Sequence, residues 1–79
     1  MPTPEELEQE EKKMRKLRIL VDFTTAVLYQ GKLSLPEMIQ LVKATRQNVL
    51  ELFPDKGDTF DLIYKPRFER IIKERLERN

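Results

Sequence analysis

The chain contains no cysteine and no histidine among its 79 residues. Without cysteine there can be no disulfide framework, no thiolate metal site and no thiol nucleophile. Without histidine the protein lacks the side chain that most often serves as a general base and as a transition-metal ligand. These two absences argue against most kinds of catalysis, so we predict a non-enzymatic protein that uses no cofactor.

Glycine and long apolar runs are also scarce. The only two glycines, Gly31 and Gly57, are far apart in the sequence, so no glycine-rich phosphate loop is present. No apolar run approaches the ~20 residues that a bilayer-spanning helix needs. The acidic segment 1–6 also differs from the basic start of a secretion signal. We therefore expect a cytoplasmic protein with no membrane segment.

The acidic segment from Asp55 to Asp61 could suggest a calcium site. A calcium loop needs oxygen ligands at alternating positions and a glutamate at the twelfth position. Counting from Asp55, the third position is Gly57 and the twelfth is Pro66. The pattern fails at both positions, so we predict no metal site and interpret these acidic residues as helix-capping residues.

The first helix has a clear start and a clear end in the sequence. Thr3 and Glu6 form the pattern of a capping box, and Pro4 suits the first helical position. Gly31 is the residue type that ends many helices in the left-handed conformation. We therefore predict a long helix over about 4–30, with Gly31 left-handed at its end.

The second helix is predicted over about 35–53. Ser34 and Glu37 form a second capping box at its start. Pro54 then stops it, because the residue before a proline is disfavoured in the helical conformation.

The third helix is predicted over about 59–78, beginning at Asp58 or Thr59. Pro66 lies inside its apolar pattern and is expected to kink or split the helix nearby. Because the apolar phase continues across the proline, we favour a kink. That pattern consists of Phe60, Ile63, Tyr64, Phe68, Ile71, Ile72 and Leu76.

Three helices joined by short loops predict an all-α, antiparallel three-helix bundle. We expect one domain over residues 1–79, with residues 1–3 disordered. The apolar half of the first helix, which contains Ile19, Leu20 and Phe23, is expected to enter the core. At ~1.5 Å per residue the first helix would be ~40 Å long and the second only ~28 Å. About the first third of the long helix therefore lacks a partner within the chain.

That unpartnered part carries two charge blocks of opposite sign. Residues 5–11 contain five glutamates, and residues 12–18 contain five lysines and arginines. Two copies packed antiparallel around residues 11 and 12 would set each acidic block against a basic block, as in a coiled coil. We therefore predict a homodimer and a helical protein-interaction function. The candidate self-association seam consists of Leu7, Glu11, Met14, Arg15, Leu17 and Arg18. An acidic helix of a different protein, docked on residues 12–18, is the other partner considered.

The alternative function is a small nucleic-acid-associated regulator. Residues 33–53 superficially resemble a helix-turn-helix. Such a unit needs a small residue inside its first helix and a glycine in its tight turn. Those two positions are occupied by Ile39 and Lys43, so the pattern fails at both. One continuous helix is the better interpretation. The remaining support is the basic C-terminal stretch, whose lysines and arginines alternate with Glu69, Glu74 and Glu77.

A candidate patch for an anion or an acidic partner consists of Lys65, Arg67 and Arg70. If a new helix began at Pro66, cations would lie at its positive end, and such a conflict can mark an anion site. If the helix is continuous and kinked, no free helix end exists and the conflict disappears. We favour the continuous helix.

Overall fold

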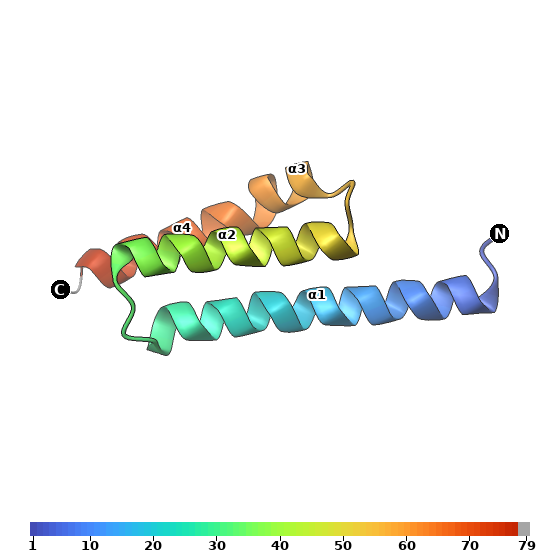
Figure 1. Cartoon of the computed structure of the whole chain (residues 1–79), viewed down its shortest axis with the longest axis horizontal. Helices are drawn as coiled ribbons and strands as arrows, with labels where there is room; N and C mark the ends of the chain where they lie inside the picture. The colour runs from blue at the N-terminus through green and yellow to red at the C-terminus, as the bar shows by residue number, and fades with distance from the viewer. Residues whose placement is uncertain (78–79) are drawn as a thin grey trace.

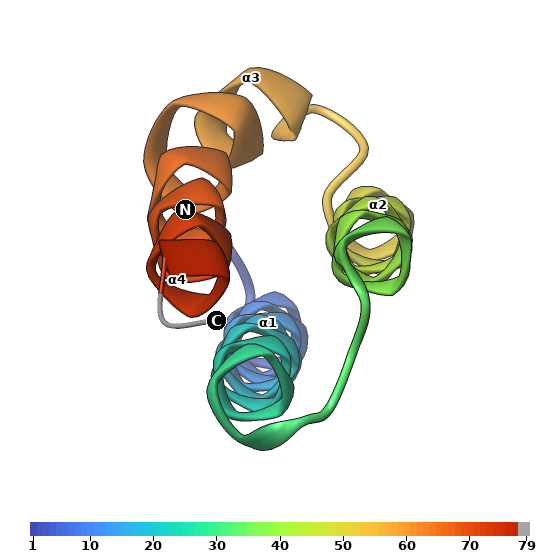
Figure 2. The same ribbon diagram turned by 90° about the vertical axis from the view of Figure 1, so that its left-hand side faces the viewer.

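The computed structural model describes residues 1–77, and these form an all-α, three-helix bundle with no strand. The long helix α1 (Pro4–Gln30) is followed by α2 (Leu35–Leu52). The third rod consists of three consecutive segments: α3 (Gly57–Thr59), the π-helical turn η1 (Phe60–Tyr64) and α4 (Lys65–Glu77). Figure 1 shows α2 returning along α1, and Figure 2 shows the three rods at the corners of a triangle. The predicted fold class is confirmed.

Both predicted capping boxes are present at the helix starts. The Thr3 hydroxyl accepts a hydrogen bond from the Glu6 N–H at 3.2 Å, and the Glu6 carboxylate accepts one from the Thr3 N–H at 3.3 Å. Ser34 and Glu37 make the equivalent pair of bonds at the start of α2. These bonds satisfy amide groups that have no partner inside the helix, which explains why both helices begin where the sequence predicts.

Gly31 ends α1, but the prediction that it is left-handed is wrong. Its backbone is extended, with φ −72° and ψ 149°. Its N–H donates to the Val27 carbonyl oxygen at 2.7 Å. A Cβ at this position would lie only 2.5 Å from that same oxygen. Glycine is therefore required for this close approach and not for a positive φ.

The third rod is kinked and continuous, as we favoured. The Lys65 N–H donates to the Phe60 carbonyl oxygen, which makes one wide π turn directly before Pro66. Proline lacks an N–H, and its ring would collide with the carbonyl group of the preceding helical turn, so a locally widened turn suits it. The rod begins at Gly57, one or two residues earlier than predicted. The predicted last residue, 78, lies outside the described residues.

The core lies where the three rods meet. Two buried threonines, Thr24 of α1 and Thr45 of α2, place their hydroxyl oxygens 2.6 Å apart within it. The expectation that the whole apolar half of α1 enters the core is wrong for Ile19 and Phe23, which are each 61% exposed. The buried apolar residues are Leu17, Leu28, Met38, Val49, Phe53, Phe60, Phe68, Ile71 and Ile72.

Two polar contacts fix the third rod against the other helices. Arg46 of α2 forms a two-pronged ion pair with Asp61 of η1, at 2.8 and 3.1 Å. Arg75 of α4 donates to the carbonyl oxygens of Tyr29 and Gly31, at 2.9 and 2.7 Å. Arg75 therefore caps the C-terminal end of α1 from a neighbouring helix, where a cation is electrostatically favourable.

Candidate self-association surface on helix α1

The N-terminal half of α1 extends beyond the rest of the bundle (Figure 1). Every residue from 1 to 16 is exposed, and Leu17 is the first buried side chain of the helix. The molecule is consequently elongated, with extents of 52 × 22 × 15 Å. The part of α1 that carries both charge blocks thus makes almost no contact with the rest of its own chain. We call residues 4–16 the protruding half of α1.

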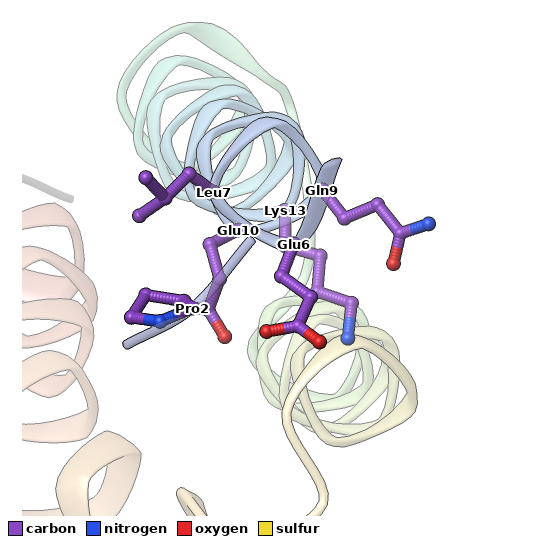
Figure 3. Close-up of a pocket in the computed structure, with 6 residues that line it drawn as sticks. All are labelled: Pro2, Glu6, Leu7, Gln9, Glu10 and Lys13. Carbon is purple, nitrogen blue, oxygen red and sulfur yellow. The ribbon is translucent and has the colours of Figure 1, made fainter. Parts of the chain in front are cut away.

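The stripe of α1 that enters the core becomes polar in the protruding half. Glu6, Glu10 and Lys13 precede Leu17 at spacings of three and four residues, so they lie on the same side of the helix. Figure 3 shows their charged groups extending to one side of α1, with Leu7 and Gln9 on its flanks. A polar stripe cannot extend the core of the bundle. The protruding half is therefore built for solvent or for a partner with charged groups.

Five of the six residues of the predicted seam do lie together. Leu7 and Met14 remain 51% and 45% exposed. Together with Glu10 they line one shallow hollow on the surface of α1, which Glu11, Arg15 and Arg18 complete. The sixth residue, Leu17, is only 6% exposed because it packs into the core of its own bundle. Its side chain is therefore already used and adds little to the seam.

Neither charge block is neutralised by ion pairs within residues 1–77. Within residues 1–77, the only ion pair shorter than 4 Å joins Arg46 and Asp61. Five negative charges on residues 5–11 and five positive charges on residues 12–18 thus stay available on the protruding half and its base. Unpaired charges of this kind guide the orientation of a partner more than they add affinity.

The candidate anion patch is divided by the helix geometry. Arg67 and Arg70 line a groove of about 320 Å³ between α1 and α4, together with Tyr29 and Tyr64. Lys65 does not line this groove. Because helical residues precede Pro66, α4 has no free N-terminus. The cations therefore do not lie at the positive end of a helix, and the unfavourable placement that could have marked an anion site does not arise.

Arg46 and Asp61 perturb each other's protonation. The hydrogen bond from Arg46 lowers the pKa of Asp61 below its ordinary value, and Lys65 lowers it a little further. The same bond raises the pKa of Arg46. At the start of α2, hydrogen bonds from Ser34 lower the pKa of the capping carboxylate Glu37. All three shifts belong to contacts that hold helices in place.

The sequence patterns did not predict the polar contacts between helices. They did not indicate that Arg46 binds Asp61. They also did not indicate that the hydroxyls of Thr24 and Thr45 meet. A threonine at a core position of each of two neighbouring helices was the one available signal, because a buried hydroxyl needs a hydrogen-bond partner.

Several structural features bear on the other predictions. Helix α2 runs without a break from Leu35 to Leu52, so the segment that resembles a helix-turn-helix has no turn. Within the described residues no helix is long and apolar enough to cross a membrane. In the same part of the chain, no three acidic side chains gather as a metal site would require.

Comparison with models of known protein families, with curated proteins and with solved structures finds no match for the chain.

Proposed function

We propose that the chain is a non-enzymatic interaction module that forms a homodimer through the protruding half of α1. One observation carries the proposal. The protruding half exposes two apolar side chains, Leu7 in the acidic block and Met14 in the basic block, and neither block has an ion-pair partner among residues 1–77. A second copy of the same helix supplies complementary groups for all of them.

The charge pattern favours an antiparallel dimer. A two-fold axis near residues 11 and 12 sets residues 5–11 of each copy against residues 12–18 of the other, so five negative charges face five positive charges twice. A parallel pair would align like charges along the whole contact, which is destabilising. The antiparallel contact is self-complementary and closes on two copies, as the symmetry of a dimer requires.

The dimer is expected to be weak and sensitive to salt. Exposed ion pairs contribute only ~0.2–1 kcal/mol each, and salt screens them. Leu7 and Met14 provide the apolar contact that salt does not weaken. Size-exclusion chromatography with light scattering at low and high salt measures this directly. A mass of 9.5 kDa at high micromolar concentration and low salt would overturn the proposal.

Two charge-reversal variants test the pairing of the blocks. The acidic-only variant carries Lys12→Glu, Lys13→Glu and Arg15→Glu, and the basic-only variant carries Glu8→Lys, Glu10→Lys and Glu11→Lys. Each should be monomeric alone, and a mixture of the two should dimerise. Lys43→Glu and Lys73→Glu, at exposed positions of α2 and α4, serve as the matched control. If each reversal variant still dimerises alone, the blocks do not face each other.

Engineered cysteines test the orientation, because the natural chain contains none. In an antiparallel pair, Glu11→Cys lies on the seam beside the two-fold axis and should form a disulfide between copies on mild oxidation. Arg18→Cys also lies on the seam, but far from its counterpart, and should not. Efficient cross-linking at both positions would show a parallel pair and contradict the proposed arrangement.

Two other partners remain as predictions. An acidic helix from another protein, docked on residues 12–18, would leave the chain monomeric when it is alone. Nucleic acid is supported only by the mixed-charge helix α4, since the uninterrupted α2 removes the helix-turn-helix. A filter-binding titration with duplex DNA tests it, because phosphate contacts would make binding fall steeply with salt. Absence of binding at low salt would remove that function.

A further inference from the structure

Two adjoining hollows on the seam side of α1 have the same geometry. Among the residues that border each hollow, four residues of α1 occupy positions i, i+3, i+4 and i+7. In the first hollow these are Leu7, Glu10, Glu11 and Met14, and in the second they are Met14, Leu17, Arg18 and Val21. Four residues at this spacing form the hole that receives one side chain of a facing helix in a coiled coil. The two hollows are therefore consecutive holes, one heptad apart, on one face of α1.

The second hollow has an extra wall from the third rod. Tyr64, the last residue of η1, borders it beside Val21 of α1. Leu17 is buried in the core, and Val21 and Tyr64 are half-buried against that core. Figure 2 shows the third rod as a direct neighbour of α1. A side chain placed in this hollow would contact both rods and would lose more water than it could lose against a single helix.

The spacing of the exposed apolar side chains matches the spacing of the hollows. Leu7 and Met14 of the protruding half are also one heptad apart. With an antiparallel second copy on the seam, its Leu7 enters the second hollow at the level of residues 17 and 18. Its Met14 then enters the first hollow at the level of residues 10 and 11. Both placements need the same two-fold axis, close to residue 12, so one register fills all four hollows of the pair.

The charges along the contact fit the same register. One flank of the seam carries two acidic and two basic residues at spacings of three and four, which are Glu8, Glu11, Arg15 and Arg18. None of them has an ion-pair partner within residues 1–77. A two-fold axis sets this flank against the same flank of the second copy. Arg15 then lies at the level of residues 9 and 10 of the second copy, between its Glu8 and its Glu11.

We propose that Leu7 of a second copy fills the hollow between α1 and the third rod, in contact with Val21 and Tyr64. This inference rests on the proposed homodimer, and it adds η1 to an interface that the sequence assigned to the first helix alone. The contact also fixes the register, because a shift of one turn would move Leu7 out of the hollow. It further makes the second copy recognise the folded bundle, since an isolated helix lacks the Tyr64 wall.

Nuclear magnetic resonance of a mixed sample tests the contact directly. The second hollow is centred ~16 Å along α1 from Leu7 of the same chain, so those two sites do not touch within one copy. Equal amounts of chain with ¹³C-labelled leucine and methionine methyl groups and of unlabelled chain are combined at low salt. A nuclear Overhauser effect is expected between the labelled Leu7 methyl groups and the ring protons of unlabelled Tyr64.

The same sample separates the inference from the homodimer on which it rests. Effects between copies at Met14, with none between Leu7 and Tyr64, would overturn the inference and leave the homodimer in place. If the natural chain is monomeric at low salt, the homodimer and the contact with Tyr64 both fail.

Side-chain truncation gives a second readout. Leu7→Ala should weaken dimerisation by about 10- to 100-fold in sedimentation equilibrium, because Leu7 is buried twice in each dimer. Ile19→Ala is the matched control, since Ile19 is an exposed apolar residue on another face of α1, beside α2, and it should have little effect. Tyr64→Leu should also weaken dimerisation, and less so once Leu7 is already alanine. Equal effects of Leu7→Ala and Ile19→Ala in a chain that dimerises would contradict the inference.

Discussion

The buried hydroxyl pair of Thr24 and Thr45 should set how closely α1 and α2 approach. Their oxygens are 2.6 Å apart, and each hydroxyl also lies within hydrogen-bond distance of a carbonyl oxygen of its own helix, at 2.8 and 2.9 Å. Two protons must serve these three contacts, so one threonine donates to the other at any moment. Only oxygen atoms that share a proton can approach this closely, because apolar contacts are optimal near ~3.5–4.0 Å.

Thr45→Val replaces one of these oxygens by a methyl group and should force the helices apart. The methyl group needs ~1 Å more room, and overpacking of this kind costs ~1–3 kcal/mol. Loss of the hydrogen bond adds ~1 kcal/mol, for a total of ~2–4 kcal/mol. Thr45→Ser keeps the hydroxyl and loses one methyl group, which costs only ~1 kcal/mol. A chain of this length has a total stability of ~4–12 kcal/mol, so the valine variant should lose at least ~8 °C in Tm.

Thermal unfolding followed by far-ultraviolet circular dichroism measures both variants. Low protein concentration and high salt keep dimerisation from adding to the apparent stability. Thr25→Val is the matched control, because its hydroxyl donates only to the Val21 carbonyl oxygen within its own helix, at 2.8 Å. If Thr45→Val proves as stable as Thr45→Ser, the hydroxyl contact does not determine the spacing of the two helices.

Three further changes test other contacts of the fold. Gly31→Ala should cost ~1–3 kcal/mol in urea unfolding, because the new Cβ would lie 2.5 Å from the Val27 carbonyl oxygen and the backbone would have to shift. The pKa of Asp61 is lowered by Arg46, so the pair stabilises the fold above the ordinary carboxyl pKa, and this contribution is lost as the pH falls through the lowered pKa. Asp61→Asn should therefore reduce the dependence of Tm on acid pH, and unchanged dependence would refute this. Phe68→Ala should cost ~3–5 kcal/mol, since Phe68 is 1% exposed, and urea unfolding measures the loss.

The sequence predicted the helices well wherever the deciding chemistry is local. The capping boxes of Thr3 with Glu6 and of Ser34 with Glu37 involve residues three apart, so they can be recognised without knowledge of the fold. Pro66 predicts a kink for the same reason. The form of the kink, a π turn over Phe60–Tyr64, was not predicted, because several backbone adjustments can accommodate a proline.

The errors concern residues whose surroundings come from distant parts of the chain. Gly31 was expected to be left-handed, as at many helix ends, but its extended backbone places its carbonyl oxygen on Arg75, 44 residues away. Ile19 and Phe23 were expected in the core because they are apolar and helical. Both stay largely exposed, and Ile19 only borders a shallow hollow at the edge of α2, because apolar periodicity does not indicate how wide an arc of α1 the neighbouring rods cover.

The candidate site was predicted for the most part, because a helix turns sequence spacing directly into surface position. Leu7, Glu11, Met14 and Arg18 recur every three or four residues, and Arg15 follows Glu11 by four, so all five border one hollow. Leu17 belongs to the adjacent stripe that the bundle buries. The groove beside α4 was not foreseen, because it exists only where two rods from opposite ends of the sequence meet.

The two halves of α1 thus depend on different forces. From Leu17 onward, helix α1 is held by packing against α2 and α4. The protruding half has only the capping box at Thr3 and its own backbone hydrogen bonds, and an isolated helix of about this length is marginal in water. A second copy that pairs both charge blocks would supply the missing contacts, so order in this half and dimerisation should reinforce each other. That coupling offers a physical reason for a helix to carry two opposite charge blocks beyond the end of its own bundle.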